Sequence, residues 1–169
     1  MGQALLTGWI KKGIGPITVV EPKPAAALKA LAKSKKITLV GSLPMSRRFS
    51  ACVVAIKPQV LKGEAPFLAD FANSGALMIS IAAGTDTKRL FQAWGSKARI
   101  VRAMPNTPGA IGQGITGLFA TKAAKPADVK LADTLLAALG QTVWVKSEKL
   151  IDSVTAVAGL ELPAALESA

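Results

Sequence analysis

The feature that most constrains this chain is a series of short segments in which consecutive residues, rather than alternate ones, are apolar. "ACVVAI" at 51–56 and "ALMISI" at 76–81 are the clearest examples. Such strands are typical of a parallel sheet that is covered by helices on both faces. Comparable segments occur at 17–21, 37–40, 98–103, 115–120 and 142–145. Longer amphipathic or alanine-rich segments separate most of them, so the order predicts a doubly wound α/β domain.

The predicted helices have recognisable ends. Asp86 is placed to cap a helix over 87–94, and Pro126 is placed to begin a helix over 126–139 that Gly140 ends. After Val145 the composition changes, and "EKLIDSVTAVAG" has a helical pattern. We expect a linker there, followed by the first helix of a second unit.

Four predicted strands are followed by loops of similar chemistry: "EPKP", "KPQ", "AAGT" and "MPNTP". In an open α/β sheet, ligands bind at the carboxyl ends of the strands. These loops are therefore expected along one edge of the sheet. The stretch "VRAMPNTPGAIGQG" at 101–114 is the most unusual, because its prolines stiffen the backbone and its glycines allow close approach. The residues leave open whether a ligand or the next strand makes that approach.

The net charge of +11 is concentrated in the first third of the chain: residues 1–50 contain nine basic residues and only one acidic residue. A nucleic acid, a phosphate-bearing cofactor or an ordinary basic surface would each account for it. Nucleic acid is the disfavoured partner, because no aromatic residues are interleaved with the basic ones and no recognition-helix pattern is present.

Composition also limits the chemistry. The chain has no histidine, which excludes imidazole catalysis and histidine-ligated metals, and its acidic residues form no close-spaced cluster, so no metal is expected. The single cysteine, Cys52, fits a reducing compartment, and we expect it to be a core residue in a cytoplasmic protein. No segment is long and apolar enough to predict a membrane span.

Five segments, "CVVAIKPQVL", "ISIAAGT", "VRAMPNTPGAIGQGITGLFA", "GQTVWV" and "IDSVTAVAG", resemble those of pyrroline-5-carboxylate reductases in order and spacing. The resemblance covers roughly residues 1–159. It implies an N-terminal Rossmann domain, followed in the family by an all-helical domain that dimerises and completes the active site. The implied activity is NADPH- or NADH-dependent reduction of 1-pyrroline-5-carboxylate to L-proline.

The resemblance also assigns site residues. Gly2 corresponds to the last glycine of a phosphate-binding loop. The cofactor's ribose and nicotinamide would be lined by residues that follow three of the strands: Ile56, Lys57 and Pro58, then Ala82, Ala83 and Gly84, and finally Met104, Pro105, Asn106 and Thr107. Small residues there would admit a flat ring, and Asn106 can both donate and accept hydrogen bonds.

The choice between NADP and NAD depends on the loop after the segment 17–21. Glu21 could bind the ribose hydroxyls of NAD, whereas Lys23 could meet the 2′-phosphate of NADP. Pro22 stands where the family often has a small hydroxyl residue. NADP is expected from the family and the basic surroundings, with NAD as the alternative.

The chain departs from the family at both ends. The family begins with a strand and a glycine-rich loop, of which Met1 and Gly2 match the last two residues, and "LELPAALESA" after Gly159 does not match. We therefore expect a truncated NAD(P)-binding domain over 1–146, without its first strand, and a linker with the first helix of an incomplete dimerisation domain over 147–169. On this reading the catalytic residues belong to the missing domain. Relatives of full length form homo-oligomers.

The sequence leaves two alternative functions open. The first is another Rossmann oxidoreductase, of the 6-phosphogluconate or prephenate dehydrogenase kind, against which "MPNTPGAIGQG" argues. The second is an inactive module derived from the family that binds nucleotide, nucleic acid or a partner chain through its basic first third.

Overall fold

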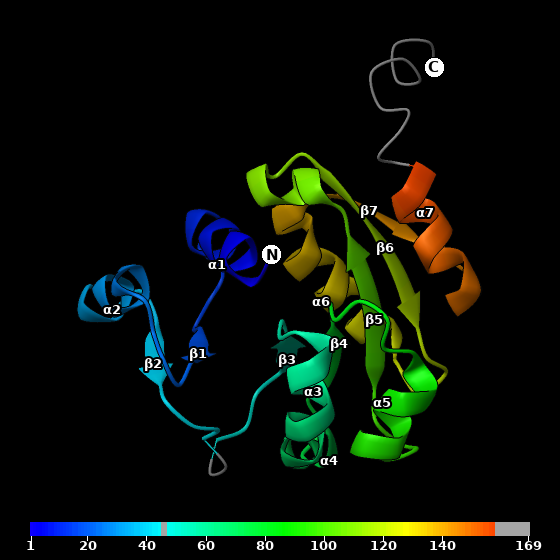
Figure 1. Ribbon diagram of the computed structural model, residues 1–169, viewed down its shortest axis with the longest axis horizontal. Coiled ribbons are helices and arrows are strands. Elements are labelled where there is room, and N and C mark those ends of the chain that lie inside the picture. Colours follow the sequence, from blue (N-terminus) through cyan, green and yellow to red (C-terminus); the bar gives the residue numbers. More distant parts are fainter. Residues whose placement is uncertain (45–46, 158–169) are drawn as a thin grey trace.

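Strands and helices alternate along the computed structural model, which describes residues 1–44 and 47–157 (Figure 1). The strands are β1 (Thr18–Val20), β2 (Thr38–Val40), β3 (Ala51–Val54), β4 (Leu77–Ser80), β5 (Ile100–Pro105), β6 (Gly114–Ala120) and β7 (Gly140–Trp144). The α-helices are α1 (Gly2–Lys11), α2 (Ala26–Lys33), α3 (Pro58–Glu64), α4 (Ala69–Asn73), α5 (Thr87–Trp94), α6 (Pro126–Leu136) and α7 (Ile151–Val157). Short 3-10 helices are η1 (Ala65–Leu68), η2 (Thr107–Ile111), η3 (Ala137–Leu139) and η4 (Glu148–Leu150).

The strands form two sheets. β3, β4, β5, β6 and β7 lie side by side in that order, and every neighbouring pair is parallel except β5 and β6. β1 and β2 pair with each other in a separate parallel sheet. The predicted doubly wound, mainly parallel α/β fold is therefore confirmed.

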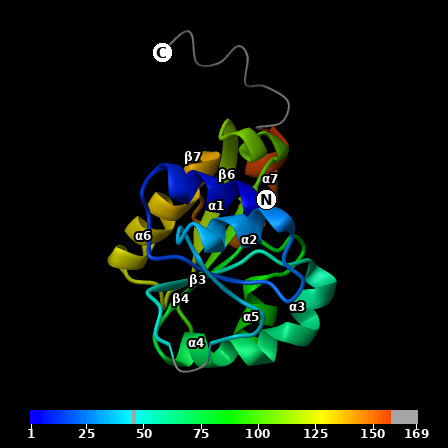
Figure 2. The same cartoon turned by 90° about the vertical axis from the view of Figure 1, so that its left-hand side faces the viewer.

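Helices cover both faces of the five-stranded sheet (Figures 1 and 2). On one face, Met78 and Ile100 pack with residues of α3, η1, α4 and α5. On the other, Leu77 and Ile79 pack with Leu5 of α1 and with α6. All four residues of β4 have no exposed surface. This burial explains why its sequence is apolar at consecutive positions.

The predicted helix ends are also found. The Asp86 carboxylate accepts a hydrogen bond from the backbone N–H of Arg89 at 2.9 Å, which caps α5. Pro126 is the first residue of α6, and Gly140 has a φ of 125° directly after η3. That value lies in the region that favours glycine.

Helix α7 packs on the same face of the sheet as α5. Ile151 is fully buried, and its carbonyl oxygen lies 3.1 Å from the position that a Cβ on Gly117 of β6 would take. The stretch 147–169, predicted to be a linker and the first helix of a second unit, thus packs against the sheet through α7, and residues 158–169 lie outside the described residues. The boundary at residue 146 stays a prediction.

Among the helices of the described part of the chain, none is long and apolar enough to cross a bilayer.

Candidate functional site

Three loops meet at one edge of the five-stranded sheet. β3, β4 and β5 are parallel neighbours, so the residues after them lie at the same end. These residues are Ile56, Lys57 and Pro58 after β3, Ala82, Ala83 and Gly84 after β4, and Met104, Pro105, Asn106 and Thr107 at the end of β5 and the start of η2. The topology thus brings ten residues of the predicted site to one edge.

The first turn of α1 lies at the same edge. The Cβ position of Gly2 is 3.0 Å from the Cβ of Ala55, which follows β3, and the Cβ position of Gly109 in η2 is 3.6 Å from the Met1 sulfur. α1 has no acidic residue in its first turn and no side-chain cap. The positive end of the α1 dipole is therefore not neutralised there, and such an end favours anions.

The loops after β3 and β4 expose small residues and one lysine to solvent. Lys57, Ala83 and Gly84 are exposed, whereas Ala82 is buried beneath them. Gly84 has a φ of 69°, and no atom lies within 4 Å of the position that its Cβ would occupy. A flat group could therefore approach the backbone at this point.

Asn106 is held by the start of β6. Its side-chain oxygen accepts a hydrogen bond from the Ile115 N–H at 2.9 Å, and its own N–H donates to the Ile115 carbonyl at 3.2 Å. The side-chain nitrogen, Nδ2, is buried and has no hydrogen-bond partner among the residues that the structure describes. Asn106 therefore has a fixed orientation and an unused donor.

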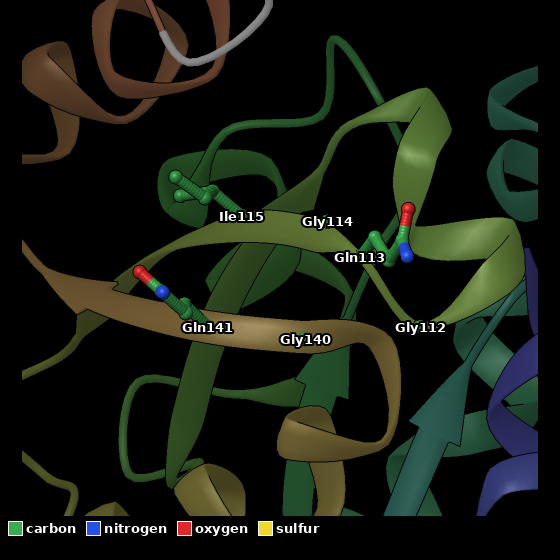
Figure 3. A pocket seen from close by; sticks show the side chains of 6 residues that line it. All are labelled: Gly112, Gln113, Gly114, Ile115, Gly140 and Gln141. Carbon is green, nitrogen blue, oxygen red and sulfur yellow. The ribbon is translucent and has the colours of Figure 1, made fainter. Parts of the chain in front are cut away.

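A hollow of about 260 Å³ lies next to this edge, at the starts of β6 and β7 (Figure 3). It is lined by Gly112, Gln113, Gly114, Ile115, Gly140 and Gln141. None of the predicted cofactor residues lines it. A dinucleotide would need the more open surface that the three loops and α1 form.

The glycines after Asn106 have a structural explanation. A Cβ on Gly114 would lie 2.5 Å from the Cα of Gly109 and 2.7 Å from the Asn106 side-chain oxygen. Gly112 has a φ of 77°, in the left-handed region. The glycine at position 114 is therefore explained by close contact with the protein's own backbone at Gly109, not by the approach of a ligand.

Pro22 and Lys23 are placed differently from the other predicted residues. They follow β1 in the two-stranded sheet, so no strand pairing aligns them with the loops after β3, β4 and β5. The Glu21 carboxylate accepts a hydrogen bond from the Lys23 N–H at 3.0 Å, which orders this turn. Both Pro22 and Lys23 are exposed.

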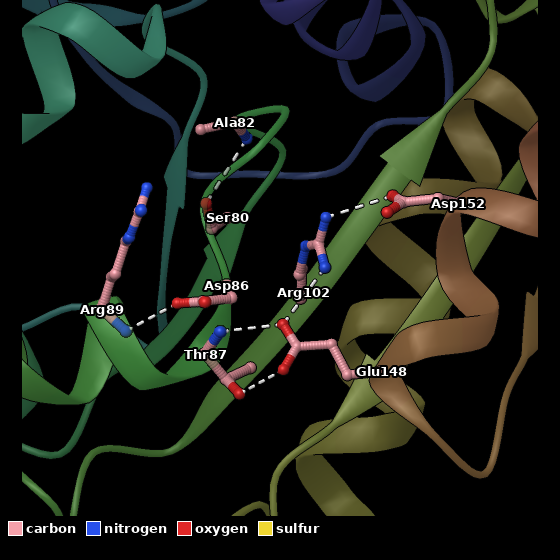
Figure 4. Close-up of polar contacts among 8 residues, drawn as sticks. All are labelled: Ser80, Ala82, Asp86, Thr87, Arg89, Arg102, Glu148 and Asp152. Carbon is pink, nitrogen blue, oxygen red and sulfur yellow. Dashed lines mark hydrogen bonds and ion pairs between the residues drawn. The ribbon is translucent and has the colours of Figure 1, made fainter.

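A polar network around the buried Arg102 was not predicted from the sequence (Figure 4). Arg102 of β5 is 6% exposed, and its guanidinium contacts Glu148 and Asp152, each at 3.2 Å. Glu148 also accepts hydrogen bonds from the Thr87 N–H at 2.8 Å and from the Thr87 hydroxyl at 2.6 Å. Arg102 thus joins β5 to Glu148 of η4 and Asp152 of α7.

Cys52, which was predicted to be a core residue, is half buried and packs against the core. It packs on the cluster that includes Met78 and Ile100, and burial raises the pKa of its thiol to about 11. A thiol with this pKa stays protonated at neutral pH and is a poor nucleophile. In the described ranges of the chain, no group of three or more Cys, Asp or Glu side chains is arranged to hold a metal ion.

The chain is similar to known pyrroline-5-carboxylate reductases. It is 34% identical over 160 residues to that enzyme of Haemophilus influenzae, an alignment covering 94% of this chain and 59% of the relative. The Coxiella burnetii enzyme structure matches with a TM-score of 0.83 and 29% identity, covering 93% of this chain and 59% of that one. The Plasmodium falciparum enzyme, solved with NADP bound, has a TM-score of 0.76 and 26% identity, with 94% and 58% covered. No protein-family model matches.

The fold is shared more widely. Prephenate dehydrogenase of Aquifex aeolicus matches with a TM-score of 0.66 but only 17% identity, over 91% of this chain and 60% of that one. This likeness shows the fold alone. The predicted resemblance to pyrroline-5-carboxylate reductases is confirmed, and the chain spans about 59% of the length of the first relatives that it matches.

Proposed function

We propose that this chain, which is related to the pyrroline-5-carboxylate reductases over 94% of its length, binds NADPH along the carboxyl ends of β3, β4 and β5. In this proposal it contributes one side of a site that reduces 1-pyrroline-5-carboxylate to L-proline. The observation that carries the proposal is the convergence of ten predicted residues with the first turn of α1 at one sheet edge.

The residues at this edge fit a dinucleotide. The unneutralised start of α1 suits a pyrophosphate, and the exposed Lys57 adds positive charge beside it. Ala83 and the open space at Gly84 suit the approach of a flat nicotinamide ring. The buried, unpartnered Nδ2 of Asn106 is a donor available to a bound group.

The chemistry divides between cofactor and protein. When bound, reduced nicotinamide supplies the hydride that an imine carbon accepts, and the imine nitrogen becomes a secondary amine by protonation. The residues described here position the ring: the Ile115 N–H donates to the Asn106 side-chain oxygen, and the Ala82 N–H donates to the Ser80 hydroxyl at the start of the loop after β4. The groups that bind the substrate carboxylate and close over the imine are not identified among these residues.

NADP is the proposed cofactor in preference to NAD. The Plasmodium falciparum relative was solved with NADP bound. In this chain Lys23 is exposed after β1, while the Glu21 carboxylate is already hydrogen-bonded to the Lys23 backbone. A 2′-phosphate would gain a cation at Lys23, which favours NADP. The reducing cytoplasm is the proposed compartment, because the chain has one cysteine and that cysteine packs against the core.

Two measurements on the same sample test the proposal. NADPH fluorescence measures cofactor binding, and proline formed from 1-pyrroline-5-carboxylate measures the reaction. Saturable NADPH binding is the expected result. A sample that forms proline with no dependence on NADPH or NADH would overturn the assigned reaction.

A further inference from the structure

The loop after β4, residues 81–86, is held by hydrogen bonds at both of its ends. At its start, the Ile81 N–H donates to the Val54 carbonyl at 3.1 Å, which extends the pairing with β3. At its end, Thr87 donates to the Glu148 carboxylate from its N–H at 2.8 Å and from its hydroxyl at 2.6 Å (Figure 4). The second anchor therefore comes from a residue 61 positions further along the chain.

The middle of this loop is exposed and includes a glycine. Ala83 and Gly84 are both exposed, and no atom beyond the neighbouring residues lies within 4 Å of the position that a Cβ on Gly84 would take. Glycine adopts positive and negative φ about equally well, so Gly84 does not by itself select the φ of 69° that it has here. The conformation of the loop therefore depends on where its two ends are held.

The Glu148 anchor is itself fixed to the sheet. Its carboxylate contacts the Arg102 guanidinium at 3.2 Å, and the Arg102 side chain is only 7% exposed. Arg102 is paired in register with Ser80, the last residue of β4 before the loop. The hydrogen bonds that Thr87 donates to a carboxylate are of the stronger, charge-assisted kind. One carboxylate thus fixes the end of the loop relative to the strands from which the loop leaves.

Capping of α5 does not account for both bonds from Thr87. Asp86 already caps this helix by accepting the Arg89 N–H at 2.9 Å. The bond from the Thr87 N–H satisfies a further donor of the first turn. The bond from the Thr87 hydroxyl satisfies no helix N–H group. It fixes instead the side chain of the residue at which the loop ends, and this residue is buried.

We propose that Glu148, acting through Thr87, is a positioning residue for the nicotinamide half of the cofactor. The inference rests on the proposed function, in which the nicotinamide ring lies against Ala83 and Gly84. Glu148 does not touch the cofactor in this proposal, and it holds the loop in the conformation that the ring contacts. The phosphates lie at the start of α1 and beside Lys57 in the same proposal, so their binding does not depend on this anchor.

Two ligands separate this role from a general effect on folding. NADPH carries the nicotinamide, whereas adenosine 2′,5′-bisphosphate carries only the adenosine and phosphate half. A variant that merely unfolds part of the sample lowers the binding of both ligands together. A variant that displaces the loop should weaken NADPH and leave the affinity for the bisphosphate unchanged.

Thr87→Val is the first variant, because it removes the hydroxyl and leaves Glu148 paired with Arg102. We expect NADPH to bind at least about threefold more weakly, and the bisphosphate as well as before. Thr87→Ser restores a hydroxyl and should restore the NADPH affinity. The matched control is Thr134→Val, which removes a hydroxyl bonded to the Lys130 carbonyl at 2.9 Å in α6 and should leave both affinities unchanged.

Glu148→Asp tests the carboxylate itself, because it keeps the negative charge near Arg102 but shortens the side chain by one methylene. It should weaken NADPH selectively, as Thr87→Val does. If Glu148 acts through Thr87, the double variant should bind NADPH no more weakly than the weaker single variant. Losses that multiply in the double variant would contradict this.

The outcomes for the parent protein and the variants are distinguishable. Binding of both ligands by the parent, with an unchanged NADPH affinity in Thr87→Val, would overturn the inference alone. Equal weakening of both ligands would overturn it as well, because it would show a loss of folded protein. A parent that binds neither ligand would contradict the proposed cofactor site, and this inference with it.

Discussion

Glu148 accepts two hydrogen bonds from Thr87, one from its N–H at 2.8 Å and one from its hydroxyl at 2.6 Å. Thr87 is the first residue of α5, so this carboxylate neutralises the start of that helix from a distant part of the chain. The same carboxylate contacts the buried Arg102 at 3.2 Å. One side chain thus joins α5 and β5 to the segment before α7 (Figure 4).

Glu148→Ala should therefore destabilise the fold by about 1–3 kcal/mol, because it leaves Arg102 buried without this partner and removes the acceptor of Thr87. Urea denaturation followed by circular dichroism measures the change. The matched control is Lys149→Ala, at an exposed neighbouring position, which should stay within about 0.5 kcal/mol of the parent. Equal losses in both variants would contradict the role given to Glu148.

Gly114→Ala should cost about 1–3 kcal/mol, because the added Cβ would lie 2.5 Å from the Gly109 backbone. The control is Gly63→Ala in α3, where no atom lies within 4 Å of the new Cβ. There we expect a gain of about 0.5–1 kcal/mol, since alanine favours a helix more than glycine does. Unfolding midpoints of the two variants should therefore move in opposite directions.

Cys52 should react slowly with iodoacetamide. Burial raises the pKa of its thiol from 9.0 to about 11, so its thiolate fraction at pH 8 should be about a hundredfold below that of an unperturbed thiol. The folded state retains this proton between pH 9 and pH 11, so the contribution of this group to stability falls as the pH rises through that range. Rapid alkylation of the folded protein at pH 8, matching that in denaturant, would refute the assignment of Cys52 to the core.

Lys57→Gln should weaken NADPH binding by about threefold to tenfold, because it removes an exposed positive charge beside the proposed pyrophosphate position. Lys62→Gln is the control and should have little effect, because Lys62 is also exposed but lies in the last turn of α3, whose first residue follows Lys57. Fluorescence titrations at two salt concentrations provide the comparison. An equal loss of NADPH affinity in both variants would show that the affinity depends on the net charge of the protein and not on the position of Lys57.

The strands could be predicted because their residues are apolar at consecutive positions, which burial on both faces requires. Each of the seven predicted segments overlaps a strand, and Asp86 and Pro126 occupy the helix ends assigned to them. The edge that holds the candidate site followed from the strand order, since parallel strands bring their carboxyl ends together.

Long-range pairing could not be predicted in the same way. Arg102 and Glu148 are 46 residues apart, and no local pattern relates them. Similarly, the sequence predicts that some group lies close to Gly114, but it does not predict that the group belongs to Gly109 and Asn106. These contacts depend on which strands become neighbours, including the antiparallel pairing of β5 with β6.

The edge formed by β3, β4 and β5 is the proposed binding site of NADPH. The most direct measurement is a fluorescence titration of NADPH into the protein, with Ala83→Trp as a variant that fills the exposed surface beside Gly84. We expect saturable binding by the parent and its loss in the Ala83→Trp variant, which should remain folded. Unchanged binding in Ala83→Trp, or salt-sensitive binding to an unrelated DNA duplex with no NADPH signal, would contradict it.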